Sequence, residues 1–321
     1  MPSSERRRYS VLAAALVTAL WPAHASAQTA AQGFAVERFY PSAPGAGWFV
    51  LDTLDMHGEL GGAMSLTAGY AHDSLRLRGS GAEPLNVVSS QAFTGFGFAA
   101  TYDRLRMYVN FDLPLAIQGR SGTFEGYSFA GPKVDPSSTP DAFSDLRLGG
   151  DVRLLGEADA PFRLGASAQL YFPSGTRADY ETDHTYRAMG RVLTAGDFGS
   201  LTYAGNLGVH VRPLSDPAPE GPKGSELLFG AAAGGKLSPC ASCAQRIVIG
   251  PEIFGATAFD SFFGSRATAL EALLTTRFEG TAESGATLRL KLGIGAGINA
   301  HFGAPEERAL ISVEVFDRGA H

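Results

Sequence analysis

Residues 104–118 of the 321-residue chain read RLRMYVNFDLPLAIQ, and every second residue is apolar. Successive side chains of a β-strand point to opposite faces, so this stretch predicts a strand with one apolar and one polar face. The apolar face would carry Leu105, Met107, Val109, Phe111, Leu113, Leu115 and Ile117, and the other face Arg104, Arg106, Tyr108, Asn110, Asp112 and Gln118. Alternating segments of about 9–11 residues between turn residues are typical of transmembrane β-barrels.

The same alternation recurs from residue 62 onward. It predicts twelve strands, with fourteen as the alternative count, at about residues 62–72, 85–102, 104–118, 143–155, 161–173, 185–195, 198–212, 225–237, 245–259, 266–279, 286–300 and 308–316. The faces are mixed in 185–195, 245–259 and 266–279. Pro251 requires either a bulge or a sheet position that lacks its hydrogen bond.

The connections support a barrel. Those after strands 2, 4, 6, 8 and 10 are short, whereas those after strands 1, 3 and 5 are longer, and residues 119–142 form the longest. Short periplasmic turns that alternate with longer external loops are expected in the outer membrane. A soluble β-sandwich also alternates, but strands of globular proteins usually have about 5–6 residues. We therefore predict an all-β fold, an antiparallel up-and-down transmembrane barrel.

The start of the chain has the features of a secretory signal peptide. Arg6, Arg7 and Arg8 precede a short apolar stretch at 9–23, and Ala25-Ser-Ala27 offers small residues for cleavage before Gln28. A membrane-spanning helix needs about 20 apolar residues, more than this stretch has. We expect 1–27 to be removed, 28–61 to form an irregular segment, 62–316 the barrel and 317–321 a tail. The apolar residues 48–51 suggest that the irregular segment plugs the barrel from the periplasmic side.

Composition and motifs argue against several functions. The net charge of −6 does not favour nucleic-acid binding. Cys240 and Cys243 predict a local disulfide or a thiol pair in an exported protein, because a metal site would need about four ligands. The glycines of 293–297 lie in an alternating strand with no helix after it, so we interpret them as small lumen-facing residues rather than a phosphate loop. No metal or cofactor is expected.

Several segments resemble the N-terminal β-barrel region of a group of OmpA-family outer-membrane proteins. They are FAVERFYP (34–41), VVSSQ (87–91), YDRL (102–105), LPL (113–115), LYFPSG (170–175), IGPE (249–252), LEALL (270–274), GIGAG (293–297), FGAP (302–305) and RAL (308–310). The resemblance covers roughly residues 34–316, and the Pro-Ser-Gly segment is also similar to barrels described as outer-membrane transporters. It implies insertion into outer-membrane lipid by the barrel-assembly machinery.

The sequence departs from that family in two ways. Family members usually continue into an acidic, calcium-binding-like repeat and a peptidoglycan-binding domain, whereas this sequence stops at His321. The peptidoglycan-anchoring role is therefore not expected. Outer-membrane barrels also commonly finish on an aromatic residue, whereas here Phe316 is followed by Asp-Arg-Gly-Ala-His.

Charged residues on the inward faces are the candidates for function. A charge at the middle of the lipid face costs about 2–4 kcal/mol, so these residues should face the lumen or the headgroups. They would either select solutes in a polar channel or pair across the lumen and close it. The candidates are Arg104, Arg106, Asp112, Asp145, Arg147, Asp151, Arg153, Arg163, Arg212, Glu226, Lys236, Glu252, Arg277, Arg289 and Lys291.

We predict that the protein lets small solutes pass through the outer membrane of a Gram-negative bacterium. A structural OmpA-like barrel with a plugged lumen is the alternative. An outer-membrane hydrolase is a second alternative, and it would need a nucleophile within hydrogen-bond reach of a base. His210 and His301 fall on inward positions, but no serine motif pairs with either, so no enzyme is expected.

Overall fold

A computed structural model describes residues 29–79, 83–135, 143–214, 216, 224–238, 245–282, 285–299 and 302–317. The predicted signal peptide 1–27 with its cleavage position, the Cys240–Cys243 pair and His301 lie outside the described residues. The helical elements in the described part are two short 3-10 turns, η1 (Arg177–Asp179) and η2 (Phe259–Ser261). No described helix has the length and apolar character needed to cross a membrane.

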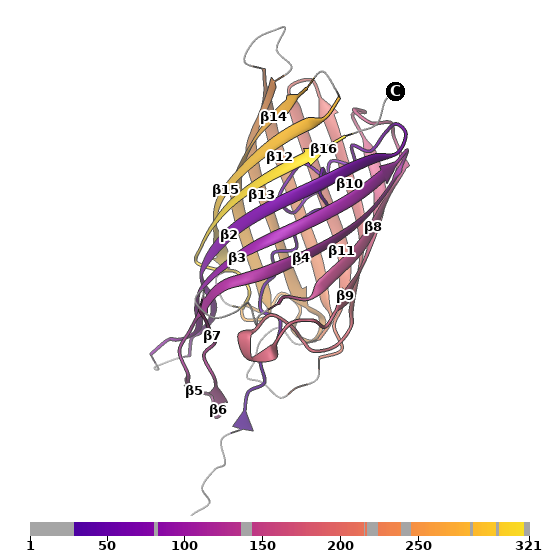
Figure 1. Ribbon diagram of the computed structural model, residues 1–321. Coiled ribbons are helices and arrows are strands. Elements are labelled where there is room, and N and C mark those ends of the chain that lie inside the picture. Colours follow the sequence, from indigo (N-terminus) through magenta and orange to yellow (C-terminus); the bar gives the residue numbers. More distant parts are fainter. Residues whose placement is uncertain are drawn as a thin grey trace, which may run out of the picture.

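The chain folds into a closed barrel of twelve antiparallel strands, as the alternation predicted (Figure 1). In chain order they are β2 (Gly61–Leu77), β3 (Leu85–Tyr102), β4 (Leu105–Gln118), β8 (Leu146–Leu155), β9 (Arg163–Phe172), β10 (Arg187–Phe198), β11 (Leu201–Val211), β12 (Glu226–Leu237), β13 (Gln245–Ala258), β14 (Thr268–Thr281), β15 (Thr287–Asn299) and β16 (Glu307–Phe316). Each strand pairs with its neighbour in sequence, and β16 pairs with β2 to close the barrel.

The two ends of the barrel differ in their connections. At one end, which we call the short-turn end, β3 and β4 are joined by residues 103–104 and β10 and β11 by residues 199–200. At the other, the long-loop end, residues 119–145 form the longest connection, which contains β5 (Gly122–Phe124), β6 (Tyr127–Phe129) and β7 (Lys133–Val134). A short strand near the start of the described chain, β1 (Thr29–Ala30), pairs with β6 at this end.

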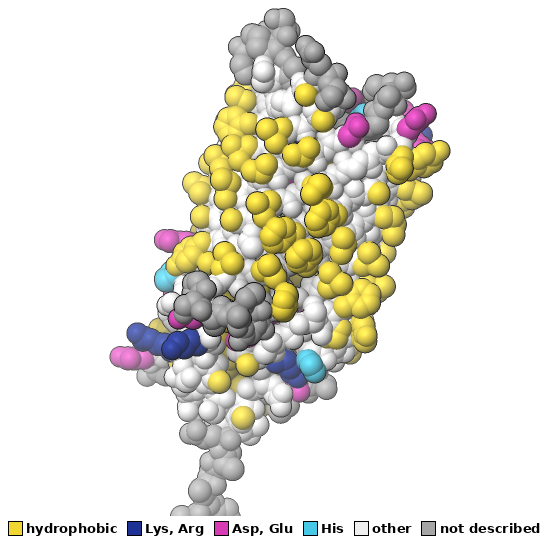
Figure 2. Space-filling view, in the orientation of Figure 1, with side chains coloured by type: hydrophobic (Ala, Val, Ile, Leu, Met, Phe, Trp, Pro, Cys, Tyr) yellow, Lys and Arg dark blue, Asp and Glu magenta, His cyan; other side chains and the backbone are white. Residues whose placement is uncertain are grey.

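The outer surface of the barrel is apolar. Figure 2 shows hydrophobic side chains over the barrel wall and charged ones gathered near its two ends. Leu207, for example, is 56% exposed in the middle of β11, and Leu292 is 41% exposed in β15. Large exposed apolar areas are rare on soluble monomers, whereas a transmembrane barrel requires an apolar band around its outside. The outward sets predicted for β2, β8, β9, β11, β15 and β16 face this surface.

The predicted faces are wrong at the end of β4. Ile117 is fully buried, and Gln118 is exposed, the reverse of the alternation. The β3–β4 register shifts at Ala92/Phe93, where Phe93 pairs with Pro114 and Ala92 with Ala116. The residue between them is an insertion in the ladder, a β-bulge, which moves the following side chains to the opposite face. Ile117 consequently packs inward at the long-loop end.

The three segments with mixed faces are all strands, namely β10, β13 and β14. Pro251 lies within β13, and the β12–β13 register is unchanged on its two sides, where Ala232 pairs with Glu252 and Gly235 with Ile249. The ladder with β12 has no pair at Pro251 itself. Of the two arrangements expected for this proline, the structure has the sheet position without its hydrogen bond rather than a bulge.

The apolar outer surface generates a test of membrane insertion. Leu207→Arg should lower the free energy of unfolding in phospholipid vesicles by about 2–4 kcal/mol, because it places a charge near the bilayer midplane. Leu201→Arg, on the same strand but next to the short-turn end, should cost only about 0–1 kcal/mol. Equilibrium urea unfolding followed by heat-modifiable gel migration measures both. Equal costs for the two variants would contradict the proposed position of the bilayer.

Candidate functional site in the lumen

The lumen of the barrel is occupied by the chain's own N-terminal segment, residues 31–60. It starts at the long-loop end, where the Ala31 N–H donates to the Ser128 carbonyl. It leaves at the short-turn end, where the Asp103 N–H donates to the Gly58 carbonyl, and continues into β2. Figure 1 shows it as the indigo coil inside the barrel. Apart from β1 at its start, this part of the chain is irregular; it runs through the whole lumen, and its start lies at the long-loop end.

Apolar side chains of the segment pack against an inner wall of small residues. Trp48, Phe49, Leu51 and Leu54 are buried in one cluster with wall residues that include Ala195, Ala204 and Ala232. Glycines supply the remaining space. A Cβ at Gly234 would lie 2.7 Å from the Trp48 ring, and one at Gly293 would lie 2.7 Å from the Phe49 ring. Gly234 of β12 and Gly293 of β15 are thus small lumen-facing residues that accommodate the segment's aromatic rings.

A buried carboxylate from the wall holds the backbone at the centre of the segment. Glu252 of β13 accepts hydrogen bonds from the Phe49 N–H at 2.9 Å and the Val50 N–H at 3.0 Å. The Thr275 hydroxyl donates to the same carboxylate at 2.5 Å. Because a buried carboxylate is costly unless it is hydrogen-bonded, these three donors make Glu252 a fixed anchor for the segment.

Arginines hold the segment nearer the short-turn end. Arg106 of β4 lies between Asp52 of the segment and Asp151 of β8, with its Nη2 3.0 Å from the Asp151 carboxylate. Arg153 of β8 donates to the Leu54 carbonyl at 3.1 Å and also to the Met56 carbonyl. Wall cations therefore satisfy both a carboxylate and the backbone carbonyls of a segment that forms no regular ladder there.

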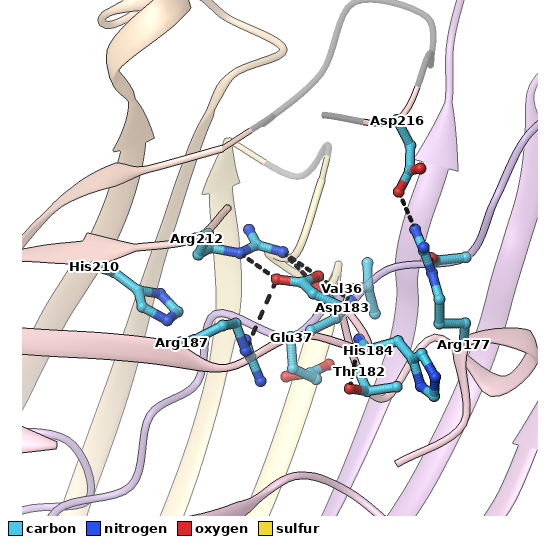
Figure 3. Close-up of polar contacts among 12 residues, drawn as sticks. Val36, Glu37, Arg177, Thr182, Asp183, His184, Arg187, His210, Arg212 and Asp216 are labelled. Atoms are coloured by element: carbon cyan, nitrogen blue, oxygen red, sulfur yellow. Dashed lines mark hydrogen bonds and ion pairs between the residues drawn. The ribbon is translucent and has the colours of Figure 1, made fainter. Parts of the chain in front are cut away.

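At the long-loop end, the β9–β10 loop folds inward and clamps the segment. Figure 3 shows Asp183 of this loop between the guanidinium groups of Arg212 and Arg187. Asp183 accepts two bonds from Arg212, at 2.7 and 2.8 Å, and one from the Ala35 N–H at 2.8 Å. Burial alone would raise the pKa of Asp183, but Arg212 and Arg187 hold the pKa below its ordinary range. The clamp is therefore charged at neutral pH.

Glu181, two residues earlier in the same loop, is in the opposite electrostatic situation. It accepts hydrogen bonds from the Gln91 amide and the Ser144 hydroxyl, and no arginine or lysine in the described part of the chain pairs with it. Burial is the largest cause of a rise in the pKa of Glu181 to about 8; the Ser144 hydrogen bond lowers this pKa, and the nearby carboxylates of Glu37 and Asp112 raise it. Glu181 is thus mostly protonated at pH 7.

The structure places most of the fifteen predicted lumen residues on the inner wall. Twelve are buried, namely Arg106, Asp145, Arg147, Asp151, Arg153, Arg163, Arg212, Glu226, Glu252, Arg277, Arg289 and Lys291. Asp112 and Lys236 are half-buried. Arg104 lies in the β3–β4 turn and pairs with the exposed Glu157 at 2.7 Å. The ion pairs run along the wall or to the segment. Arg289 and Lys291 of β15, for example, both bind Glu314 of the adjacent β16.

Sequence reasoning missed the loop carboxylates and the arginines of β10. Asp183 and Glu181 lie in a connection, where the alternation gives no signal. In β10, Arg187 and Arg191 share the inward face with the buried Met189 and Leu193. Because the inner face of β10 contacts an apolar segment, it is itself partly apolar. Polarity therefore does not show which face of this strand points inward. The inward position of Arg187 could be recognised only from its spacing to Met189 and Arg191.

Three hollows lie beside the segment along the β2–β4 side of the lumen. The first, at the long-loop end, is lined by Asp112, Arg147 and Glu181 among others. The second shares Pro41, Phe93, Asn110 and Asp112 with the first and extends to Lys291 and Glu314. The third opens at the short-turn end beside Pro44 and Arg106. Between the second and third hollows, Pro44 of the segment comes close to Gly97 of β3, where a Cβ would lie 2.7 Å from the proline ring.

A buried histidine and a His/Asp/Glu cluster could serve as a catalytic base or a metal site, but both are paired with other protein side chains. His210 is fully buried, and its Nδ1 lies 3.1 Å from the Tyr40 hydroxyl and 3.7 Å from Glu226. No serine of the described chain is hydrogen-bonded to it. His72, Asp73 and Glu306 lie close enough together to hold a metal ion, but Arg76 pairs with both carboxylates. An arginine in that position already supplies the positive charge that a metal ion would bring.

Comparison with known proteins supports the fold. The sequence matches no protein-family model and no curated protein. The structure is similar to an outer membrane channel from Pseudomonas putida F1, with 14% identity and a TM-score of 0.51 over 81% of this chain and 95% of that chain. The NanC porin has 8% identity and a TM-score of 0.44 over 78% of this chain and 98% of that chain. The beta domain of the Bordetella autotransporter Brka has 12% identity and a TM-score of 0.44 over 81% of this chain and 99% of that chain.

The packing of Trp48 against Gly234 can be tested with neighbouring glycines. Gly234→Leu should displace the ring and destabilise the barrel by about 1–3 kcal/mol through overpacking. Gly235→Leu is the matched control, because its Cβ meets nothing within 4 Å. Trp48 is the only tryptophan after residue 27, so its emission in protein that begins at Gln28 reports on the segment. We expect a red shift and acrylamide quenching for Gly234→Leu only, and equal spectra would contradict the packing.

The raised pKa of Glu181 predicts a pH dependence of stability. The ordinary pKa is 4.5 and the folded one about 8, so between these values the folded protein keeps a proton that the unfolded chain loses. The free energy of unfolding therefore falls as the pH rises through this window. Glu181→Gln should remove that fall, whereas Glu157→Gln, an exposed control, should keep it. Urea unfolding from pH 4.5 to 8.5 measures the slopes, and an unchanged slope in Glu181→Gln would refute the assignment.

Proposed function

We propose that this protein is an outer-membrane channel of a Gram-negative bacterium, through which small solutes pass along the narrow space beside the N-terminal segment. The proposal rests on the row of three hollows on the β2–β4 side. They lie from the long-loop end to the short-turn end, and Pro44 approaches Gly97 between the second and the third. The apolar outer surface supports insertion in a bilayer, and the fold is that of outer-membrane barrels.

In the proposed orientation the long loops face the outside of the cell, as is usual for outer-membrane barrels. The N-terminal segment then begins at the outer face and ends at the periplasmic face, and it acts as a plug that narrows the lumen over its full length. This differs from a plug inserted from the periplasm. Glu252, Arg106 and Asp183 would keep it in place.

A structural barrel with a closed lumen is the second candidate. The buried aromatic cluster around Trp48 favours it, since this cluster fills the middle of the lumen. The resemblance of residues 34–316 to the barrel region of OmpA-family proteins points in the same direction. In that case the three hollows would be separate, and the contact between Pro44 and Gly97 would be a seal. Neither candidate is an enzyme, in keeping with the structural partners of His210.

Single-channel recording in planar bilayers separates the two candidates. The unaltered protein should give small, uniform conductance steps. Thr67→Trp fills the second hollow and should reduce the unitary conductance at least severalfold, because Thr67 lines the proposed path. Leu66→Trp, one residue away on the lipid-facing side, should leave it unchanged. A correctly folded, heat-modifiable sample that shows no conductance would overturn the channel and favour the structural barrel.

A further inference from the structure

The first hollow holds two charged groups, Arg147 and Asp112, that form no ion pair among the described residues. Arg147 of β8 is 4% exposed and lines this hollow. No carboxylate of the described residues lies within ion-pair distance of it, and its neighbour is the Asn110 amide on the adjoining strand, which accepts from the guanidinium when its oxygen faces it. Most other buried arginines of the described wall bind a carboxylate or backbone carbonyls.

Asp112 is the acidic counterpart on the same wall. Its carboxylate lies over Gly95 of β3, where any side chain would collide with it. Among the described residues it neither accepts a hydrogen bond nor forms an ion pair. Asp112 and Arg147 line one hollow but stand too far apart to pair directly. A positive and a negative group therefore face the same space, each without an ion-pair partner among the described residues.

The other charged groups around the hollow are already satisfied. Glu37 binds Arg308 at 2.7 Å, and Asp145 binds Arg187 at 2.7 Å. Glu181 is held by Gln91 and Ser144. Two further polar atoms around the hollow have no hydrogen-bond partner in the described structure. They are the Oε1 of Gln91, which is 3% exposed, and the Nε of Arg187, whose guanidinium already pairs with Asp145. The hollow thus presents a guanidinium and a carboxylate without ion-pair partners, and an amide oxygen without a hydrogen-bond donor.

We propose that the first hollow binds a small zwitterion of amino-acid type, with its carboxylate on Arg147 and its ammonium group on Asp112 and the Gln91 Oε1. A guanidinium presents paired donors that match a carboxylate, and an ammonium group needs several acceptors. The rings of Phe39, Tyr40, Phe93 and Tyr171 line the same hollow and provide faces that attract a cation. Such a ligand satisfies all three unmet groups, whereas an anion or a cation alone leaves one charge buried and unpaired.

The inference goes beyond the channel function, because binding inside the lumen requires no continuous path. Isothermal titration of the full-length, detergent-folded protein with three matched probes tests it. The probes are L-alanine, which is a zwitterion, L-alanine methyl ester, a cation, and N-acetyl-L-alanine, an anion. We expect L-alanine to bind at least tenfold more tightly than either derivative. Equal binding of a derivative, or no binding by any probe to heat-modifiable protein, would overturn the proposal.

Two variants and a control assign the site. Arg147→Gln and Asp112→Asn should each weaken L-alanine binding at least tenfold. Lys236→Gln removes a charge near the short-turn end, outside this hollow, and should not change it. If either site variant fails to fold, the comparison of the three probes on the unaltered protein still shows whether the lumen binds a zwitterion. Binding without conductance would refute the channel alone, and conductance without binding would refute only the zwitterion site.

Discussion

A twelve-stranded barrel encloses a space that its own wall does not fill, and the rest of this structure depends on how that space is occupied. Eight-stranded barrels fill their interior with wall side chains, and barrels of sixteen strands hold water. Here the wall is lined in its middle by glycine and alanine, which leaves room for a second layer. The N-terminal segment supplies that layer with Trp48, Phe49 and Leu51, so wall and segment form one apolar core in a protein whose outside is also apolar.

The alternation along the chain was sufficient to predict the barrel, because lipid imposes an apolar outer face on every strand. Leu207 and Leu292 have to be apolar whatever lies inside. The prediction failed where local backbone geometry overrode the period of two, as at the bulge before Ile117. It was also weak in β10, since Met189 and Leu193 turn apolar side chains inward to meet the segment. The inner face contacts apolar side chains in some places and charged ones in others, so its polarity cannot be inferred from strand periodicity.

The lumen site was predictable only in part, for a related reason. Inward arginines and carboxylates could be named from their positions, but their partners come from other strands, the segment or a loop. Glu252 is an example, since it holds backbone N–H groups two hundred residues away in sequence and no local pattern announces them. The pairing of Asp183 with Arg212 likewise depends on the β9–β10 loop folding inward. What distinguishes Arg147 and Asp112 is the lack of such partners, which only a three-dimensional arrangement reveals.

In the proposed channel, the strength of the contacts that hold the segment decides where solutes can pass. Each hydrogen bond to a charged group contributes about 1.5–3 kcal/mol, and burial of a large apolar side chain a similar amount. Losing only the three hydrogen bonds from the segment to Glu252 and Asp183 and the burial of Trp48 would cost roughly 6–12 kcal/mol. Since about 1.4 kcal/mol corresponds to a factor of ten, fewer than about one molecule in a thousand would have an empty lumen. In the proposed channel, steady permeation therefore has to occur with the segment in place, along β2–β4 and past the close approach of Pro44 to Gly97.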